Sequence, residues 1–154
     1  MSPDIVDLLQ ALNEANVRFL VVGAYAVGVH GHPRATKDFD VWVEASEANA
    51  PRVLAALRTF GAPLMGLTEA ELRSPGVGLQ IGVPPVRIDL LTKLSGVEFA
   101  EAWPHRLEAT FGETTCGVLG LEELLRNKRA SARPQDLADV AALERLRRLK
   151  QEVP

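Results

Sequence analysis

The sequence has little of what secreted or membrane-spanning proteins require. One of its 154 residues is cysteine, so no internal disulfide can form, and only 5% of residues are aromatic. No apolar run approaches the roughly 20 residues of a membrane helix. Asp4 and Asp7 lie where a secretion signal would carry positive charge. We therefore expect an intracellular, cytoplasmic protein with no membrane partner.

The composition is that of a folded globular protein, with 47% hydrophobic and 24% charged residues. We expect residues 1–154 to form a single domain, since a chain of this length can bury a core without disulfides or structural metal. The net charge of −3 is uneven: residues 1–121 hold 9 basic against 14 acidic side chains, and residues 122–154 hold 8 against 6. So small an excess does not support nonspecific nucleic-acid binding over the whole surface.

Apolar spacing, glycines and prolines predict an α/β (α+β) unit in which helices and strands alternate. The predicted helices cover residues 3–15, a short stretch from 23, and residues 49–60, 68–72, 97–107 with an interruption at Pro104, 121–132 and 134–150. The predicted strands cover residues 18–22, 38–43, 79–83, 86–91 and 114–119, with Pro84 and Pro85 forming a tight connection between two of them. We expect residues 121–150 to form two closing helices.

Two carboxylates share one face of the strand predicted at residues 38–43. Asp38 and Asp40 are two residues apart, which places their Cα atoms roughly 6 to 7 Å from each other. Asp89 lies in an otherwise apolar strand, where an ionised side chain is costly to bury without a partner. Three acids on neighbouring strands would favour Mg²⁺, and two such ions can organise phosphoryl or nucleotidyl transfer. The alternative interpretation is that the two acids simply lie at a solvent-facing strand edge, which is commoner for an Asp-x-Asp sequence than a metal site.

A strand that runs directly into Gly23 and Ala24 supports the interpretation of the three acids as a magnesium site. Backbone N–H groups exposed at such a turn can hold phosphate. The turn comes 15 residues before Asp38. By itself this turn is weak support, because strand-to-helix turns of small residues are widespread.

In combination these segments resemble the nucleotidyltransferase superfamily related to DNA polymerase β. The resemblance rests on Val21-Val22-Gly23-Ala24, Arg34-Ala35-Thr36-Lys37, Asp38-Phe39-Asp40-Val41 and Ile88-Asp89-Leu90. Residues 127–139 resemble the last motif of its small bacterial, abortive-infection toxin-like members. The resemblance implies a small mixed β-sheet flanked by helices.

The resemblance also implies roles for particular residues. Asp38, Asp40 and Asp89 would be the catalytic, metal-binding acids, holding two Mg²⁺ ions. The predicted nucleotide-binding residues are Gly23, Ala24, Arg34, Thr36 and Lys128. Ala24 departs from the family, which usually has glycine or serine there, and this removes a hydroxyl contact to the triphosphate.

The function implied is transfer of a nucleoside monophosphate from Mg²⁺-bound NTP, such as ATP, to a hydroxyl acceptor, with release of pyrophosphate. The resemblance leaves open whether the acceptor is RNA, a protein or a small molecule. It also leaves open whether the chain forms a homodimer or binds a partner protein. The alternative is a catalytically weak domain of this fold that acts as a binding partner in a toxin–antitoxin pair. A serine hydrolase is not supported, since no Gly-x-Ser-x-Gly motif occurs.

Several other residues have both a functional and an ordinary interpretation. His30 could ligate a transition metal, but an ordinary loop histidine is the favoured interpretation because no third ligand is evident. Trp42 shares a face with Asp38 and Asp40, so it could stack on a base or simply pack in the core. Lys37 could reach a phosphate or be a solvated charge. Cys116 has no neighbouring histidine and is not expected to be a nucleophile.

Overall fold

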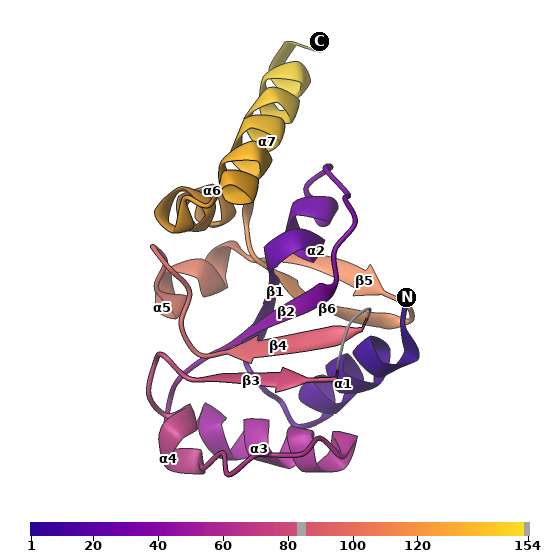
Figure 1. The fold of residues 1–154 in the computed structure, drawn as a ribbon, viewed down its shortest axis with the longest axis vertical. Helices are drawn as coiled ribbons and strands as arrows, with labels where there is room; N and C mark the ends of the chain where they lie inside the picture. Colours follow the sequence, from indigo (N-terminus) through magenta and orange to yellow (C-terminus); the bar gives the residue numbers. More distant parts are fainter. Residues whose placement is uncertain (83–85, 153–154) are drawn as a thin grey trace.

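The computed structural model describes residues 1–82 and 86–152, and its centre is a six-stranded sheet (Figure 1). The strands are β1 (Phe19–Val22), β2 (Asp38–Val43), β3 (Gly78–Ile81), β4 (Arg87–Leu91), β5 (Leu107–Phe111) and β6 (Thr114–Val118). The helices are α1 (Pro3–Glu14), α2 (Gly23–Val29), α3 (Asn49–Phe60), α4 (Glu69–Leu72), α5 (Phe99–Ala102), the 3-10 helix η1 (Trp103–His105), α6 (Leu121–Ser131) and α7 (Pro134–Glu152).

The sheet is mixed, as the family resemblance implies, and its strand order is β3-β4-β2-β1-β6-β5. β2 runs parallel to β4 and β1 parallel to β6, whereas the pairs β1–β2, β3–β4 and β5–β6 are antiparallel. β1 and β2 therefore lie in the middle of the sheet. All four residues of β1 are buried, which explains why that strand is uniformly apolar.

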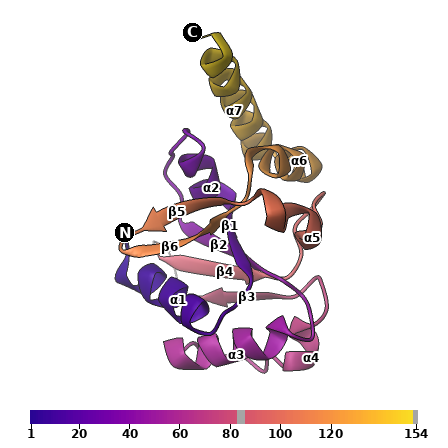
Figure 2. The same cartoon turned by 180° about the vertical axis from the view of Figure 1, so that it is seen from behind.

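One apolar cluster joins the two faces of the sheet to the helices. α1 and α3 pack against each other and contribute their apolar sides to it, and Figure 2 shows both near the same end of the molecule, away from α6 and α7. On one face of β2, Phe39 packs against Tyr25 with ring centroids 4.7 Å apart. On the other face, Trp42 packs against Phe99 at 4.9 Å. Trp42 is thus buried by packing.

Most predicted elements are confirmed, several to the residue. β2 and α3 have the predicted bounds, and α4 is capped by Thr68 in a capping box in which Thr68 and Glu71 each accept from the other's backbone N–H. The strand predicted at residues 79–83 corresponds to β3, which begins one residue earlier. Residue 83 and the Pro84–Pro85 connection lie outside the described residues.

The helix predicted at residues 97–107, with an interruption at Pro104, is confirmed only in part. The chain forms α5, then η1 around Pro104, and then the strand β5, which the sequence analysis missed. Proline removes a backbone donor and ends the helix. β5 is an edge strand with four of its five residues at least partly exposed, so it lacks the apolar alternation by which a strand is recognised.

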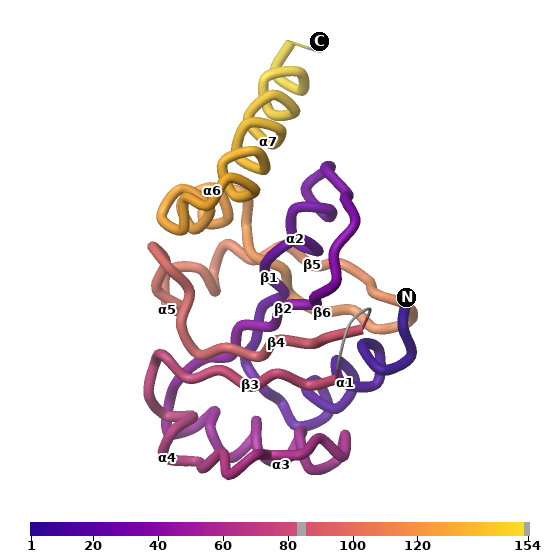
Figure 3. Tube along the Cα trace, viewed as in Figure 1, coloured from indigo at the N-terminus to yellow at the C-terminus, as the bar shows by residue number. Residues whose placement is uncertain are grey.

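The two predicted closing helices are present as α6 and α7. Ala132 has a left-handed φ of 53° and ends α6, after which Pro134 begins α7. Figures 1 to 3 show α7 extending away from the sheet, with its C-terminal end farthest from it. Within residues 1–82 and 86–152, no helix combines the length and apolar character needed to cross a membrane.

Candidate active site

The three predicted catalytic acids come together on two neighbouring parallel strands. Asp40 on β2 lies directly opposite Asp89 on β4, and Asp38 lies opposite Arg87. Because side chains alternate along a strand, Asp38, Asp40 and Asp89 all project from the same face of the sheet. The side chains of Asp38 and Asp89 are 31% and 22% exposed, so solvent reaches them.

Asp40 is electrostatically the most perturbed of these acids. Burial raises its pKa to about 6, and the negative charges of Asp89 and Asp38 act in the same direction. Lys128 and Arg133 oppose this rise without cancelling it. Burial also raises the pKa of Asp89, against the attraction of Arg87. Such raised values indicate a crowded negative site that a cation would stabilise.

The sequence analysis missed the cation that lies among these acids, Arg87. Its Nη2 donates to Asp38 Oδ2 at 3.0 Å and to Asp89 Oδ2 at 3.4 Å. Its Nε lies 3.3 Å from Asp89 Oδ1, close enough for an ion pair but without hydrogen-bond alignment. The signal was present in the sequence, because Arg87 is two residues from Asp89 and therefore shares its face of the strand.

Position 23 requires glycine because the backbone there lies close to the Asp40 carboxylate. Gly23 has a left-handed φ of 69°, and a Cβ at this position would lie 2.0 Å from Asp40 Oδ2. Only glycine leaves room for the carboxylate to lie against the turn between β1 and α2. This is a geometric link between the predicted turn and the predicted acids.

A cleft of about 510 Å³ adjoins the acids, and we call it the acid cleft. It is lined by seven of the eight predicted site residues, Gly23, Ala24, Arg34, Thr36, Asp38, Asp40 and Lys128. Asp89 stands beside Asp40 outside this lining. The sequence analysis did not single out Lys93, Ser95 and Asn127, which also line the cleft.

Arg34 and Lys128, the predicted phosphate ligands, are paired with carboxylates of α7. Arg34 donates twice to Asp139, at 2.9 and 3.0 Å, and Lys128 Nζ lies 3.2 Å from Asp136 Oδ1 and 3.3 Å from Asp139 Oδ2. Lys128, Asp136 and Asp139 are almost fully buried. A phosphate contact from either cation would require it to exchange these partners.

The same charged groups explain why the pKa values of Asp136 and Asp139 are lowered. Burial alone would raise the pKa of Asp136, but hydrogen bonds from Arg133 and Lys128 bring it below its usual range. For Asp139, hydrogen bonds from Arg34 and Gln135 outweigh burial in the same way and lower the pKa. Both carboxylates are therefore ionised, and they fix α7 to α6 and to the loop that carries Arg34.

The remaining candidate residues have ordinary structural roles. Thr36 Oγ1 is within 3.3 Å of both backbone N and O of Asp38, so it pins the entry to β2. His30 Nε2 lies 2.8 Å from the backbone oxygen of Leu119. Cys116 is buried, and burial raises its pKa to about 12, which makes it a poor nucleophile.

Comparison with solved structures identifies the architecture. A Thermotoga maritima protein assigned as a nucleotidyltransferase superposes with a TM-score of 0.53 at 14% identity, covering 96% of this chain and 91% of its own. The antibiotic-resistance factor ANT(2'')-Ia gives 0.57 at 15%, with the same two coverages. The chain has the nucleotidyltransferase fold. An antigenic nucleotidyltransferase-like protein from Paracoccidioides brasiliensis shares this fold, with a TM-score of 0.52 at 16% identity over 93% of this chain and 75% of that one.

Sequence comparison adds no closer assignment: no protein-family model matches the chain, and no curated protein matches it. Across residues 1–82 and 86–152 of this nucleotidyltransferase fold, no group of three or more histidine, cysteine, aspartate or glutamate side chains is arranged as a ready metal site. The Arg87 guanidinium lies between Asp38 and Asp89 instead.

Proposed function

We propose that the protein is a Mg²⁺-dependent nucleotidyltransferase that moves a nucleoside monophosphate from an NTP to a hydroxyl acceptor. The observation that carries the proposal is the register of β2 and β4, which sets Asp40 opposite Asp89 beside Asp38 at the edge of the acid cleft. The nucleotidyltransferase fold supports it, as does the turn at Gly23 packed against Asp40.

The carboxylates fit a magnesium ion by the chemistry of their donors. Asp38 Oδ1 and Asp89 Oδ1 are buried and have no hydrogen-bond partner in the described part of the chain. Hard carboxylate oxygens are the ligands Mg²⁺ prefers, and bound Mg²⁺ would neutralise the triphosphate and the charge that develops during transfer. Asp38, Asp40 and Asp89 would hold it once the Arg87 guanidinium turns away from them.

The remaining residues position the reactants. The turn at Gly23 and Ala24 would hold the β- and γ-phosphates, with Lys128 or Arg34 exchanging an α7 carboxylate for phosphate oxygens. The acceptor oxygen forms a bond to the α-phosphorus as the α–β bridging P–O bond breaks, and pyrophosphate leaves. Asp89 would take the acceptor proton, because its carboxylate stands beside Asp40 at the edge of the acid cleft.

A specific observation also supports the second candidate, a catalytically weak binding partner in a toxin–antitoxin pair. Arg87 already neutralises two of the three acids, which an inactive relative of this fold would need for stability. Ala24 lacks the hydroxyl that the family usually offers to the triphosphate. The two candidates differ in whether an NTP is consumed.

The test is transfer of label from α-³²P NTPs in the presence of Mg²⁺, with RNA, protein and small-molecule fractions of a cell extract as acceptors. We expect label in one fraction with the wild type and at least a hundredfold less with Asp40→Ala, since such charge-stabilising groups contribute about that much or more. Asp7→Ala removes an exposed acid of α1 and serves as the matched control. Equal labelling by wild type and Asp40→Ala would refute the proposed enzyme.

A further inference from the structure

One cation of the acid cleft is not held by any carboxylate. The cleft is lined by four basic side chains, those of Arg34, Lys93, Lys128 and Arg133. Three of them are paired with Asp136 or Asp139 of α7, and Lys93 is the exception. Within residues 1–82 and 86–152, Lys93 forms no ion pair and no side-chain hydrogen bond. An anion that enters the cleft therefore reaches Lys93 without displacing another partner.

The backbone is fixed on both sides of Lys93. Before it, the Thr92 side chain is buried and accepts from the Val77 backbone N–H at 2.9 Å. After it, Asn127 of α6 donates to the Ser95 backbone oxygen at 3.0 Å. Lys93 itself is exposed, and its ammonium is carried on a flexible four-carbon stem. The fold therefore presents a movable cation from a fixed point on the wall of the cleft.

Close packing against α6 also fixes the turn that follows Lys93. Gly96 in this turn has a left-handed φ of 78°. A Cβ there would lie 2.7 Å from Ala130 Cβ and 3.2 Å from the Arg126 backbone oxygen, both on α6. Only glycine leaves room for this contact. The segment that carries Lys93 is thus held against the helix that carries Lys128, another residue of the cleft wall.

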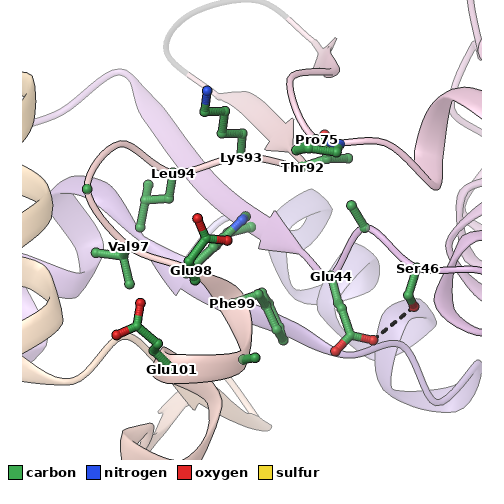
Figure 4. A pocket seen from close by; sticks show the side chains of 14 residues that line it. Glu44, Ser46, Pro75, Thr92, Lys93, Leu94, Val97, Glu98, Phe99 and Glu101 are labelled. Carbon is green, nitrogen blue, oxygen red and sulfur yellow. Dashed lines mark hydrogen bonds between the residues drawn. The ribbon is translucent and has the colours of Figure 1, made fainter.

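Lys93 has acidic groups on two sides. On one side is the acid cleft, whose lining includes Asp38 and Asp40. On the other is a cavity of about 770 Å³ that Lys93 also lines, together with three glutamates. Figure 4 shows one of these, Glu98, near the middle of that cavity and the Lys93 ammonium pointing away from it. Because this much negative charge repels a triphosphate, an unpaired cation beside the cleft favours the approach of an NTP.

We propose that Lys93 is a phosphate-binding residue for the donor nucleotide and makes the first contact with it, before Arg34 or Lys128. The assignment rests on the proposed function, which places an NTP in the acid cleft, and adds the group that first neutralises the triphosphate. A contact between an ammonium and phosphate oxygens is charge-assisted and therefore stronger than a neutral hydrogen bond. At Lys93 it forms without leaving a buried carboxylate of α7 unpaired, which would be costly.

The test measures the binding of two probes by isothermal titration calorimetry in the presence of Mg²⁺, so it does not depend on the transfer reaction. One probe is α,β-methylene ATP, in which a CH₂ group replaces the α–β bridging oxygen and prevents transfer. The other is inorganic tripolyphosphate, which has the phosphates without a nucleoside. We expect Lys93→Met to weaken binding of both probes roughly fivefold to twentyfold, because it removes a charge-assisted contact.

Two further variants assign the loss to the Lys93 ammonium. Lys93→Arg keeps a cation in the same place and should bind both probes within about threefold of wild type. Lys150→Met makes the same change of charge at the exposed end of α7 and should bind like wild type (Figure 1). Lys93→Met should fold, because Lys93 is exposed, and circular dichroism checks this. Equal affinities of Lys93→Met and wild type, or an equal loss in Lys150→Met, would overturn the assignment.

The choice of probes and the transfer assay separate this assignment from the proposed function. A loss confined to the ATP analogue would place Lys93 against the nucleoside and overturn its role in phosphate binding. Asp40-dependent transfer, with affinities for both probes that Lys93→Met leaves unchanged, keeps the enzyme and overturns the role of Lys93. Lys93-dependent binding of both probes without Asp40-dependent transfer keeps the phosphate site and refutes the enzyme. A wild type that binds neither probe and transfers nothing refutes both.

Discussion

At the scale of single residues, the candidate site sets three acids and one guanidinium close together. Asp40 is held partly buried beside Asp89 and Asp38, which raises its pKa to about 6. Arg87 offsets the repulsion for Asp38 and Asp89. Gly23 removes the steric obstacle that any other residue would place against Asp40. Each of these features has a measurable consequence.

Asp40→Asn should stabilise the protein at neutral pH while abolishing transfer. With its pKa raised from 3.8 to about 6, folded Asp40 binds its proton more tightly than the unfolded chain does, so stability falls as pH rises through that window. Removing the charge should recover up to about 3 kcal/mol at pH 7 and nothing below pH 4. Urea denaturation at both pH values measures this. A variant less stable than wild type at pH 7 would show that Asp40 is not destabilised by its surroundings.

Gly23→Ala should cost both stability and activity, because the new methyl group displaces the Asp40 carboxylate from the turn. The strained backbone alone costs about 1 to 3 kcal/mol. Gly66→Ala is the matched control: its φ of 80° imposes similar strain, but no atom lies within 4 Å of the added Cβ. Transfer should fall only in Gly23→Ala. Similar losses of transfer in both variants would mean that backbone strain, rather than displacement of Asp40, is responsible.

Arg87→Gln should tighten binding of divalent cations, because Asp38 and Asp89 lose their internal counter-charge. We expect roughly tenfold stronger Mn²⁺ binding, followed by electron paramagnetic resonance of the unbound ion. Arg106→Gln removes an exposed guanidinium that stacks on Trp103 and should leave Mn²⁺ affinity unchanged. If Arg87→Gln weakened binding instead, the guanidinium would be a support of the metal site and not its competitor.

At the scale of elements, buried ion pairs fix α6 and α7 to the rest of the fold. Lys128 on α6 contacts Asp136 and Asp139 on α7, and Asp139 also accepts from Arg34 on the loop before β2. The end of α7 contributes little to this contact and extends from the body (Figure 1). The position of the closing helices therefore depends on a few charged groups.

Lys128→Met should loosen α7, since it leaves Asp136 and Asp139 buried with one fewer cation. Removing one partner of a buried pair costs about 3 kcal/mol or more, although Arg133 and Arg34 remain nearby. Hydrogen exchange should accelerate in α7 and not in α3. Arg129→Met removes a more exposed pair with Glu144 and should cost less than about 1 kcal/mol. If the amides of α7 exchanged equally slowly in Lys128→Met and Arg129→Met, that result would contradict a structural role for Lys128.

Periodicity predicted the elements whose burial is regular and failed where the chain is irregular. β2 and α3 were predicted to the residue because one side of each is consistently apolar. The helix predicted at residues 97–107 was confirmed only in part, because the apolar residues there are shared between two short helices and the start of an exposed edge strand. The alternation of side chains placed Asp38 and Asp40 on one face of β2 and Arg87 on the same face of β4 as Asp89. The parallel register that sets Asp40 opposite Asp89 and Asp38 opposite Arg87 does not follow from that alternation.

At the scale of the whole molecule, a mixed sheet brings the β1–α2 turn, the acids of β2 and the start of α7 to one cleft, with Asp89 of β4 beside it. A larger acidic cavity adjoins it across the turn at residues 94–97. The charges are unevenly placed: Lys128 of α6 and Arg133, between α6 and α7, line the cleft with Asp38 and Asp40, and three glutamates line the second cavity.

The most direct test of this account is the fate of the phosphates of one NTP, labelled at the α-position in one reaction and at the γ-position in another. The account predicts that α-label enters the acceptor, that γ-label leaves as pyrophosphate in equal amount, and that both events disappear in Asp40→Asn despite its greater stability at pH 7. Transfer of γ-label to the acceptor, or turnover that persists in Asp40→Asn, would contradict it.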